Sequence, residues 1–336
     1  MENNVIYITL QTGERAVAIN KNDGNIAFNS NNEVELKTLE MDSIGLKTWK
    51  SDIKGVHVDR KEVADILNWV HSDKNAKAQD RVALVVGNAG MGKSVIMSDV
   101  LKKLEDEDIP VLGIKLDKLH FYSMKGLDEE SGVGKGQSII SVYEELNKRY
   151  NRSVILIDQI DALSMSLSSD RRSMDVASLL IRKLNTLPNV RIIISCRRFD
   201  LDFDYTLKQF DIYSKFYINE LPEEEVNKIL VILKVNPNKI SARVKKFLGT
   251  PINLYLYSLI NKPDLLNGEA LTLQRLYDEL WSQMLRNSTD RTKLNDFLSE
   301  VVTRMYNEQT LTINGRIFQD KYGRRGIFPW IAPRAD

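Results

Sequence analysis

The sequence predicts an α/β fold built on a parallel five-stranded sheet that is covered by helices on both faces. Short apolar runs alternate with amphipathic segments between residues 82 and 219, and the runs are continuously apolar, as strands buried on both faces are. A glycine-rich turn also joins the first run to a helix-forming segment. The expected strands lie at 82–86, 111–116, 154–157, 190–195 and 215–219, and the helices between them at 93–106, 137–149 and 174–187.

The chain before the first strand divides into a small segment and a helix. In residues 1–55, short alternating apolar runs and turns rich in Asn and Asp predict one or two β-hairpins. A helix is expected from about residue 57 to 70, with Asp59 as its N-cap and Glu62 three residues on. We count this helix as the first element of the core.

After residue 221 the pattern changes to helices alone. Pro222 and the three glutamates behind it suit a first helical turn. Helices are expected near 222–233, 239–247, 251–261 and 273–285, followed by one more helix and a short β-like run at 310–313. We expect four parts, the last of which stops partway through a third small domain: 1–55, a core at 56–221, a helical unit at 222–265 and a region at 266–336.

Composition limits the partners of the chain. Its 336 residues include 47 Lys and Arg against 46 Asp and Glu, so the formal charge of +1 predicts neither nucleic-acid nor membrane binding. The single cysteine, Cys196, excludes an internal disulfide. No apolar run approaches the roughly 20 residues that a membrane helix needs, and the first residues lack the features of a signal peptide. We therefore expect a cytoplasmic protein.

The turn after the first strand has the spacing of a phosphate-binding loop. It runs from Gly87 through four residues to Gly92, Lys93 and Ser94, and a helix follows. The glycines let backbone N–H groups surround phosphate oxygens, and the positive end of the helix adds to the attraction. Lys93 would reach the β- and γ-phosphates, and Ser94 would hold Mg²⁺. The predicted nucleotide-binding residues here are Gly87, Asn88, Ala89, Gly90, Met91, Gly92, Lys93, Ser94 and Val95.

Two aspartates follow the third predicted strand. Asp158 ends the strand, at the edge where α/β sheets bind ligands, and is the expected partner of Ser94 at the metal. Asp161 lies three residues on and could polarise a water that faces the γ-phosphate. The alternative for each aspartate is a helix cap.

The fourth strand ends in Ser195-Cys196-Arg197-Arg198. A polar residue and a cation at this strand end would lie beside the triphosphate, where Arg197 could report the presence of the γ-phosphate. The alternative is a basic turn in solvent. The predicted catalytic residues are therefore Lys93, Asp158, Asp161 and Arg197.

These motifs together resemble the STAND class of signalling ATPases, which are relatives of the NACHT and NB-ARC switch proteins within the broader AAA+-like group. The resemblance rests on Gly-Asn-Ala-Gly-Met-Gly-Lys-Ser, then Leu-Ile-Asp-Gln-Ile-Asp, then Ile-Ile-Ile-Ser-Cys-Arg, in that order. The Asp-x-x-Asp spacing of Asp158 and Asp161 resembles NACHT-type modules. Conventional AAA+ enzymes carry Asp-Glu, and Gln159 stands at that second place here.

Two further motifs extend the resemblance to about residues 56–262. Phe247-Leu-Gly-Thr-Pro251 resembles the Gly-x-Pro motif of a helical lid, which implies that Pro251 packs against adenine. Val58-Asp-Arg60-Lys-Glu62 resembles the motif that shapes the adenine pocket, although Asp59 replaces the usual glycine. Arg60 and Pro251 thus join the implied cofactor-binding residues.

The resemblance implies a P-loop NTPase core, a helical lid and a partial winged-helix domain that together bind ATP and Mg²⁺. It implies closed ADP and open ATP states, homo-oligomers of the open state, an effector protein and a trigger ligand, and often a role in antiphage defence. The chain departs from the class in its short N-terminal segment, in the absence of sensor repeats, and in having no histidine after His120.

Three functions remain open from the sequence. The first is a slowly hydrolysing ATP switch, because no residue clearly acts as an arginine finger. The second is an AAA+-type motor or loader that acts on nucleic acid or protein. Such a protein would be expected to have a basic channel or a glutamate at position 159, beside Asp158. The third is a nucleotide-dependent scaffold without hydrolysis, which the presence of Asp158 and Asp161 disfavours.

Overall fold

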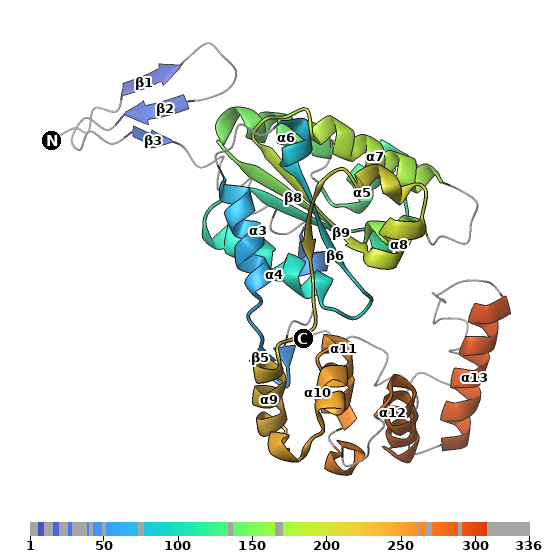
Figure 1. The fold of residues 1–336 in the computed structure, drawn as a ribbon. Helices are drawn as coiled ribbons and strands as arrows, with labels where there is room; N and C mark the ends of the chain where they lie inside the picture. Colours follow the sequence, from blue (N-terminus) through green and yellow to red (C-terminus); the bar gives the residue numbers. More distant parts are fainter. Residues whose placement is uncertain are drawn as a thin grey trace.

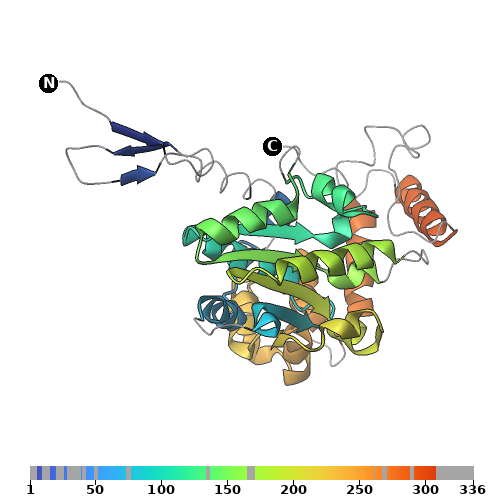
Figure 2. The same ribbon diagram turned by 90° about the horizontal axis from the view of Figure 1, so that it is seen from above.

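A computed structural model gives the protein's architecture. It describes residues 6–9, 16–19, 26–28, 39, 43–48, 52–72, 77–133, 137–164, 171–260, 262–266, 271–287 and 291–307. At its centre lies a parallel five-stranded sheet with helices on both faces, which confirms the predicted fold class (Figures 1 and 2). The strands are β6 (Val82–Gly87), β7 (Val111–Lys115), β8 (Ser153–Asp158), β9 (Val190–Arg197) and β10 (Ser214–Tyr217).

The order of the strands across the sheet is β10-β6-β9-β8-β7, and every neighbouring pair is parallel. The chain therefore starts near the middle, runs outward to β7, returns strand by strand to β9, and then crosses to the other side of β6. Because β9 lies between β6 and β8, the ends of these three strands meet at one edge.

Side chains alternate between the two faces of each strand, so the sheet has a separate hydrophobic core on each face. Leu84 and Val86 of β6 pack with one set of helices, whereas Val85 packs with the other. The first set is α5 (Met124–Glu130), α6 (Ile139–Arg149), α7 (Arg172–Leu184) and α8 (Arg198–Phe203). The second set is α2 (Ile44–Lys47), α3 (Lys61–His71) and α4 (Lys93–Asp106). The buried side chains on both faces explain why the strands are continuously apolar.

Helix α3 begins later than predicted, and Asp59 is not its N-cap. Arg60 occupies the cap position without a side-chain hydrogen bond to the helix backbone. Instead, its guanidinium bonds to the Glu62 carboxylate, which the predicted capping box would have directed toward the backbone. Residues 56–57 belong to a strand, so the chain reaches the helix in an extended conformation.

The region after β10 is helical among its described residues. It comprises α9 (Glu223–Ile232), α10 (Ala242–Leu248), α11 (Pro251–Ile260), α12 (Leu273–Asn287) and α13 (Arg291–Asn307). We call α9 to α11 the lid. A hairpin of β4 (Asp52–Ile53) and β5 (Val56–His57) joins this region, because Ile53 and Val58 lie in its hydrophobic core. The predicted β-like run at 310–313 lies outside the described residues.

Three strands lie near the N-terminus. They are β1 (Ile6–Thr9), β2 (Ala16–Ile19) and β3 (Ile26–Phe28), and they pair antiparallel in that order. None of the helices in the described part of the chain combines the length and the apolar character that crossing a membrane requires.

Candidate functional site

The turn between β6 and α4 has the conformation of an anion-binding loop. Gly90 and Gly92 adopt positive φ angles of 77° and 86°, which favour glycine. Gly92 caps α4 and offers no side chain to the first N–H groups of the helix. Those N–H groups and the helix dipole are therefore available to a bound anion.

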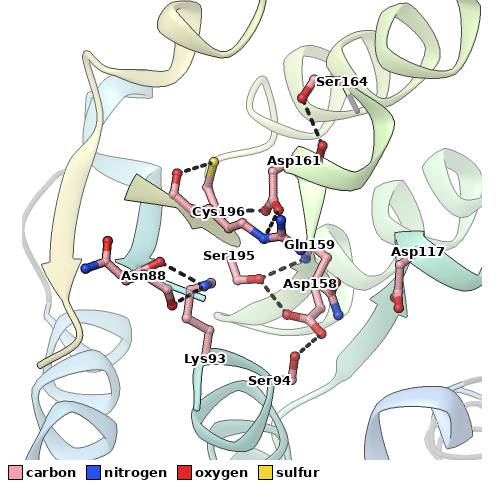
Figure 3. A network of polar contacts seen from close by, with 12 residues as sticks. Asn88, Lys93, Ser94, Asp117, Asp158, Gln159, Asp161, Ser164, Ser195 and Cys196 are labelled. Atoms are coloured by element: carbon pink, nitrogen blue, oxygen red, sulfur yellow. Dashed lines mark hydrogen bonds and ion pairs between the residues drawn. The ribbon is translucent and has the colours of Figure 1, made fainter. Parts of the chain in front are cut away.

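Asp158 lies at the centre of a buried polar network (Figure 3). The Ser94 hydroxyl donates to its Oδ2 atom at 2.8 Å, and the Ser195 hydroxyl donates to its Oδ1 atom. The ammonium of Lys115 lies 3.0 Å from the same Oδ2 atom. Asp158 has no exposed surface, so these three donors together take the place of water around its carboxylate.

The backbone after Asp158 is held in an unusual conformation. Gln159 has a positive φ of 61°, which is uncommon for a residue with a side chain. Its N–H donates to the Ser195 hydroxyl at 2.8 Å, so Ser195 links the ends of β8 and β9. This turn starts the short 3₁₀ helix Ile160–Leu163, on which Asp161 lies.

Asp161 is paired with Arg197 in a two-point contact. The Arg197 side chain approaches Asp161 Oδ2 with its Nε atom at 3.0 Å, and the Arg197 backbone N–H donates to Oδ1 at 3.1 Å. Burial raises the pKa of Asp161, although the charges of Arg197 and Lys93 oppose this shift. The Arg197 side chain remains 38% exposed, so it can reach the solvent-filled space beside the loop.

Lys93 turns back onto its own loop. Its ammonium donates to the carbonyl oxygens of Gly87 at 2.8 Å and Asn88 at 3.1 Å. Burial lowers the pKa of Lys93, and the nearby charge of Asp161 opposes that shift. A phosphate beside the loop would supply a second anion to this buried cation.

A cavity of about 600 Å³ joins these groups to the lid. Its volume is in the range of small-molecule sites, about 300–1,000 Å³. It is lined by Thr48, Asp52, Ile53, Val58, Arg60, Ala89, Gly90, Gly92, Lys93, Ser94, Val95, Gln159, Asp161, Arg197, Leu221, Pro251, Ile252 and Tyr255. The loop and strand ends therefore form one wall, and the β4–β5 hairpin and the lid form the other.

The lid contacts the loop directly. The N–H of Ile252, in the first turn of α11, donates to the Gly90 carbonyl at 3.1 Å. A Cβ atom at Gly90 would lie 2.3 Å from the Ile252 Cγ2 atom. Gly90 is thus required by the lid contact as well as by its backbone conformation.

Arg60 and Pro251, which the resemblance implied, both line the cavity. Arg60 donates to the Asn219 carbonyl at 2.7 Å and to both carboxylate oxygens of Glu62. Although burial alone would raise it, the pKa of Glu62 is lowered by the hydrogen bonds from Arg60. Arg60 therefore links the N-terminus of α3 to the segment after β10.

The other predicted residues lie close by but differ in exposure to the cavity. Gly87, Asn88 and Met91 line a neighbouring surface pocket, and Asp158 is fully buried and bonds to Ser94, which lines the cavity. Lys115, the β4–β5 hairpin and Ile252 also belong to the site, and the sequence did not predict them. Of these, only Lys115 has a signal in the sequence, as a lysine within an otherwise apolar strand, and that signal does not identify Asp158 as its partner.

Ser94 and Asp158 fit a magnesium ion by the chemistry of their donors. A hydroxyl and a carboxylate oxygen that already meet at 2.8 Å are the hard ligands that Mg²⁺ takes together with water and substrate phosphates. Within the described ranges, no group of three or more His, Cys, Asp or Glu side chains could hold a metal ion. A metal here would therefore depend on a bound phosphate for its remaining ligands.

A comparison with models of protein families relates the core to the AAA ATPases. Residues 83–216 match the model of the ATPase family associated with various cellular activities, AAA. A search of curated proteins finds no significant match.

Three of the solved structures to which this chain is similar are the following. The Walker-type ATPase PABY2304 of Pyrococcus abyssi shares 14% identity over 77% of this chain and 79% of its own, with a TM-score of 0.44. Domain III of the Thermotoga maritima replication initiation protein DnaA shares 16% over 66% and 89%, with a TM-score of 0.37. AMPPCP-bound DnaA from Aquifex aeolicus shares 13% over 72% and 74%, with a TM-score of 0.43. The core of this chain has a P-loop NTPase fold, and residues 83–216 are similar to the AAA ATPases.

Proposed function

We propose that this chain binds ATP with Mg²⁺ and hydrolyses it slowly, as a conformational switch of the signalling kind that its motifs resemble. The observation that supports the proposal best is the composition of the cavity wall. One cavity is lined by the phosphate loop, by the Asp161–Arg197 pair and by the first turn of the lid. A nucleotide in this cavity would therefore contact the groups that detect its phosphates and the element that moves.

Each residue of the loop has a proposed part in binding. The N–H groups around Gly90 and Gly92 surround the phosphates, and Lys93 shifts its ammonium from the Gly87 and Asn88 carbonyls toward the β- and γ-phosphates. Ser94 and Asp158 would hold Mg²⁺, which when bound neutralises charge on the phosphate oxygens.

The Asp161–Arg197 pair is the proposed sensor of the γ-phosphate. In its present contact, Arg197 occupies both carboxylate oxygens of Asp161. A γ-phosphate would compete for the guanidinium and free the Oδ2 atom of Asp161 to orient the attacking water, while Oδ1 keeps its bond from the Arg197 backbone N–H. After hydrolysis and phosphate release, Arg197 would return to Asp161, so the pair has two arrangements that differ with the nucleotide.

Slow turnover follows from the same contacts. Arg60 and Arg197, the arginines that line the cavity, are each engaged by a carboxylate, Glu62 and Asp161. Neither is in place to stabilise the charge of the transition state without first leaving its partner. A further arginine, supplied by a second protein, would accelerate the reaction.

Adenine is the proposed base. The part of the cavity beside the hairpin and the lid is lined by Ile53, Val58, Leu221, Pro251 and Tyr255. Such an apolar wall suits a purine ring, and closing it around the base would carry α11 with it. We further propose that the ATP state forms homo-oligomers, acts on an effector protein and serves signalling or antiphage defence.

Turnover and nucleotide-dependent proteolysis test the switch together. Purified chain with Mg²⁺ should hydrolyse ATP slowly, whereas Asp161→Asn should bind ATP and hydrolyse it about a hundredfold more slowly still. Asp202→Asn, which removes an exposed carboxylate on α8, is the matched control and should leave turnover unchanged. Limited proteolysis with ADP and with a non-hydrolysable ATP analogue should give different fragments. Many turnovers per second by the isolated monomer, or identical fragments, would contradict the proposal.

The AAA match favours one alternative, a motor or loader that remodels nucleic acid or protein. Gln159 stands where conventional enzymes of this kind carry a glutamate, which favours the switch. DNA binding that weakens steeply with salt, together with DNA-stimulated turnover, would support the motor instead. If neither the wild type nor Asp161→Asn hydrolyses ATP, the scaffold without hydrolysis becomes the better proposal.

A further inference from the structure

Lys115 is a buried lysine that the proposed reaction does not use. It ends β7, and only 4% of its surface is exposed. The parallel register pairs it directly with Asp158, the last residue of β8. Burying an ammonium is strongly unfavourable unless anions surround it, so its position requires a specific compensation.

Two carboxylates provide that compensation. The Lys115 ammonium lies 3.0 Å from Asp158 Oδ2 and 3.1 Å from Asp117 Oδ1. The Asp158 oxygen is the one that also accepts the Ser94 hydroxyl at 2.8 Å. Lys115 therefore acts on the same oxygen atom that, with Ser94, would face a magnesium ion.

We propose that Lys115 is a resident cation that partly replaces Mg²⁺ at Asp158, so that nucleotide binds with little dependence on the metal. This inference rests on the proposed nucleotide site. Without metal, the ammonium neutralises Asp158 and removes its repulsion for phosphates. With metal, the ammonium competes for the carboxylate charge and weakens the hold of the protein on Mg²⁺.

A merely structural ion pair would behave differently. It would tie β7 to β8, and its loss would lower thermal stability without changing the metal dependence of binding. The informative quantity is therefore the ratio of the ADP dissociation constant in EDTA to that in Mg²⁺. ADP is the suitable probe because it is not hydrolysed during calorimetric titration.

The main variant is Lys115→Met, which keeps the length of the side chain and removes its charge. We expect wild-type ADP affinities in EDTA and in Mg²⁺ to agree within about tenfold. In Lys115→Met, metal-free binding should weaken and Mg²⁺-dependent binding should not, so that the ratio rises by at least about tenfold. Lys115→Arg keeps the charge and should restore the wild-type ratio to within about threefold.

Asp117→Asn tests the inference in the opposite direction. It removes the second carboxylate that shares the ammonium, so the charge of Lys115 acts more strongly on Asp158 and the ratio should fall below that of the wild type. This variant also replaces Lys115→Met if the latter does not fold. The side chain of Asp117 is 31% exposed, so its substitution disturbs the core little.

The outcomes separate this inference from the proposed function. If the wild type binds no ADP in either condition, the nucleotide site itself fails, and the inference fails with it. If the wild type binds ADP but Lys115→Met or Asp117→Asn leaves the ratio unchanged, Lys115 is a structural ion pair and only this inference is overturned. A raised ratio that Lys115→Arg restores supports a resident cation.

Discussion

The two walls of the cavity are made of different chemistry. The wall from the sheet carries Lys93, Asp161 and Arg197, with Asp158 beneath it. The wall from the hairpin and the lid carries apolar residues such as Val58, Pro251 and Ile252, although Asp52 and Arg60 also line it. Under the proposed function, the sheet wall would perform the chemistry, and the other wall would contribute contact area that changes when the lid moves.

The two walls also differ in how firmly they are held. The sheet wall consists of the ends of three paired strands, in which Asp161 is paired with Arg197 and Lys93 bonds to two backbone carbonyls. The lid meets the sheet wall through few polar contacts, such as the bond from Ile252 N–H to the Gly90 carbonyl. We therefore expect substitutions in the sheet wall to abolish nucleotide binding or hydrolysis. Substitutions in the wall from the hairpin and the lid, which we call the lid wall, should change nucleotide affinity only modestly.

The largest expected effect is on the sheet wall, at Lys93. Lys93→Ala removes the cation that would meet the phosphates, and we expect ATP affinity to fall about a thousandfold, as when one member of a buried charge pair is lost. Calorimetric titration with ADP and with a non-hydrolysable ATP analogue measures the loss. Lys103→Ala, at an exposed position of the same helix, is the control and should bind normally. Unchanged affinity in Lys93→Ala would remove the basis of the nucleotide site.

Asp161→Asn should separate catalysis from stability. We expect turnover to fall about a hundredfold, as on loss of a general base. Because burial raises the pKa of the Asp161 carboxyl in the folded state, its ionisation at neutral pH opposes folding. The variant should therefore unfold at a higher temperature than the wild type at pH 7.

The pH dependence of that difference follows from the sign of the shift. The cost of ionising Asp161 is absent below its unfolded pKa of 3.8 and appears as pH rises through the raised folded value. The advantage of Asp161→Asn should thus shrink as the pH is lowered toward 4, which melting curves across pH would measure. An advantage that grows in acid would mean that Arg197 stabilises the folded carboxylate more than burial penalises it.

Prediction from sequence succeeded where local signals were sufficient. The spacing of Gly87, Gly92 and Lys93 determines a short turn between a strand and a helix, and apolar runs mark the five strands. The placement of Asp158 at a strand end followed from the same pattern. Each of these features depends on residues that are neighbours in the chain, so a single sequence carries the information.

Features that depend on distant residues were missed. Lys115 meets Asp158 because of the register between β7 and β8, and no local pattern encodes that pairing. The β4–β5 hairpin has strands of only two residues, too short for any alternation to show, and it packs on the lid through Ile53 and Val58. Arg60, which bonds to Glu62, likewise occupies the N-cap position that was predicted for Asp59.

The junction of the two walls should respond to Gly90→Ala. A Cβ atom there would clash with Ile252, and the positive φ adds strain, so we expect the lid to detach and ADP affinity to fall about tenfold. Faster proteolysis within the lid would report the detachment. Ile252→Ala removes the clashing Cγ2 atom, so combining it with Gly90→Ala should recover part of the affinity. A simple sum of the two effects would show that strain in the loop, rather than the lid contact, dominates.

The smallest effect is expected on the lid wall itself, at Tyr255. Tyr255→Ala removes apolar area beside the base, and we expect ATP and ADP affinities to fall equally, by about three- to tenfold. Because this contact is the same before and after hydrolysis, the KM should rise while kcat stays unchanged. Tyr205→Ala, at a tyrosine that is 86% exposed, should change neither constant. A fall in kcat for Tyr255→Ala would show that the lid wall takes part in the chemistry, and that the two walls do not have separate roles.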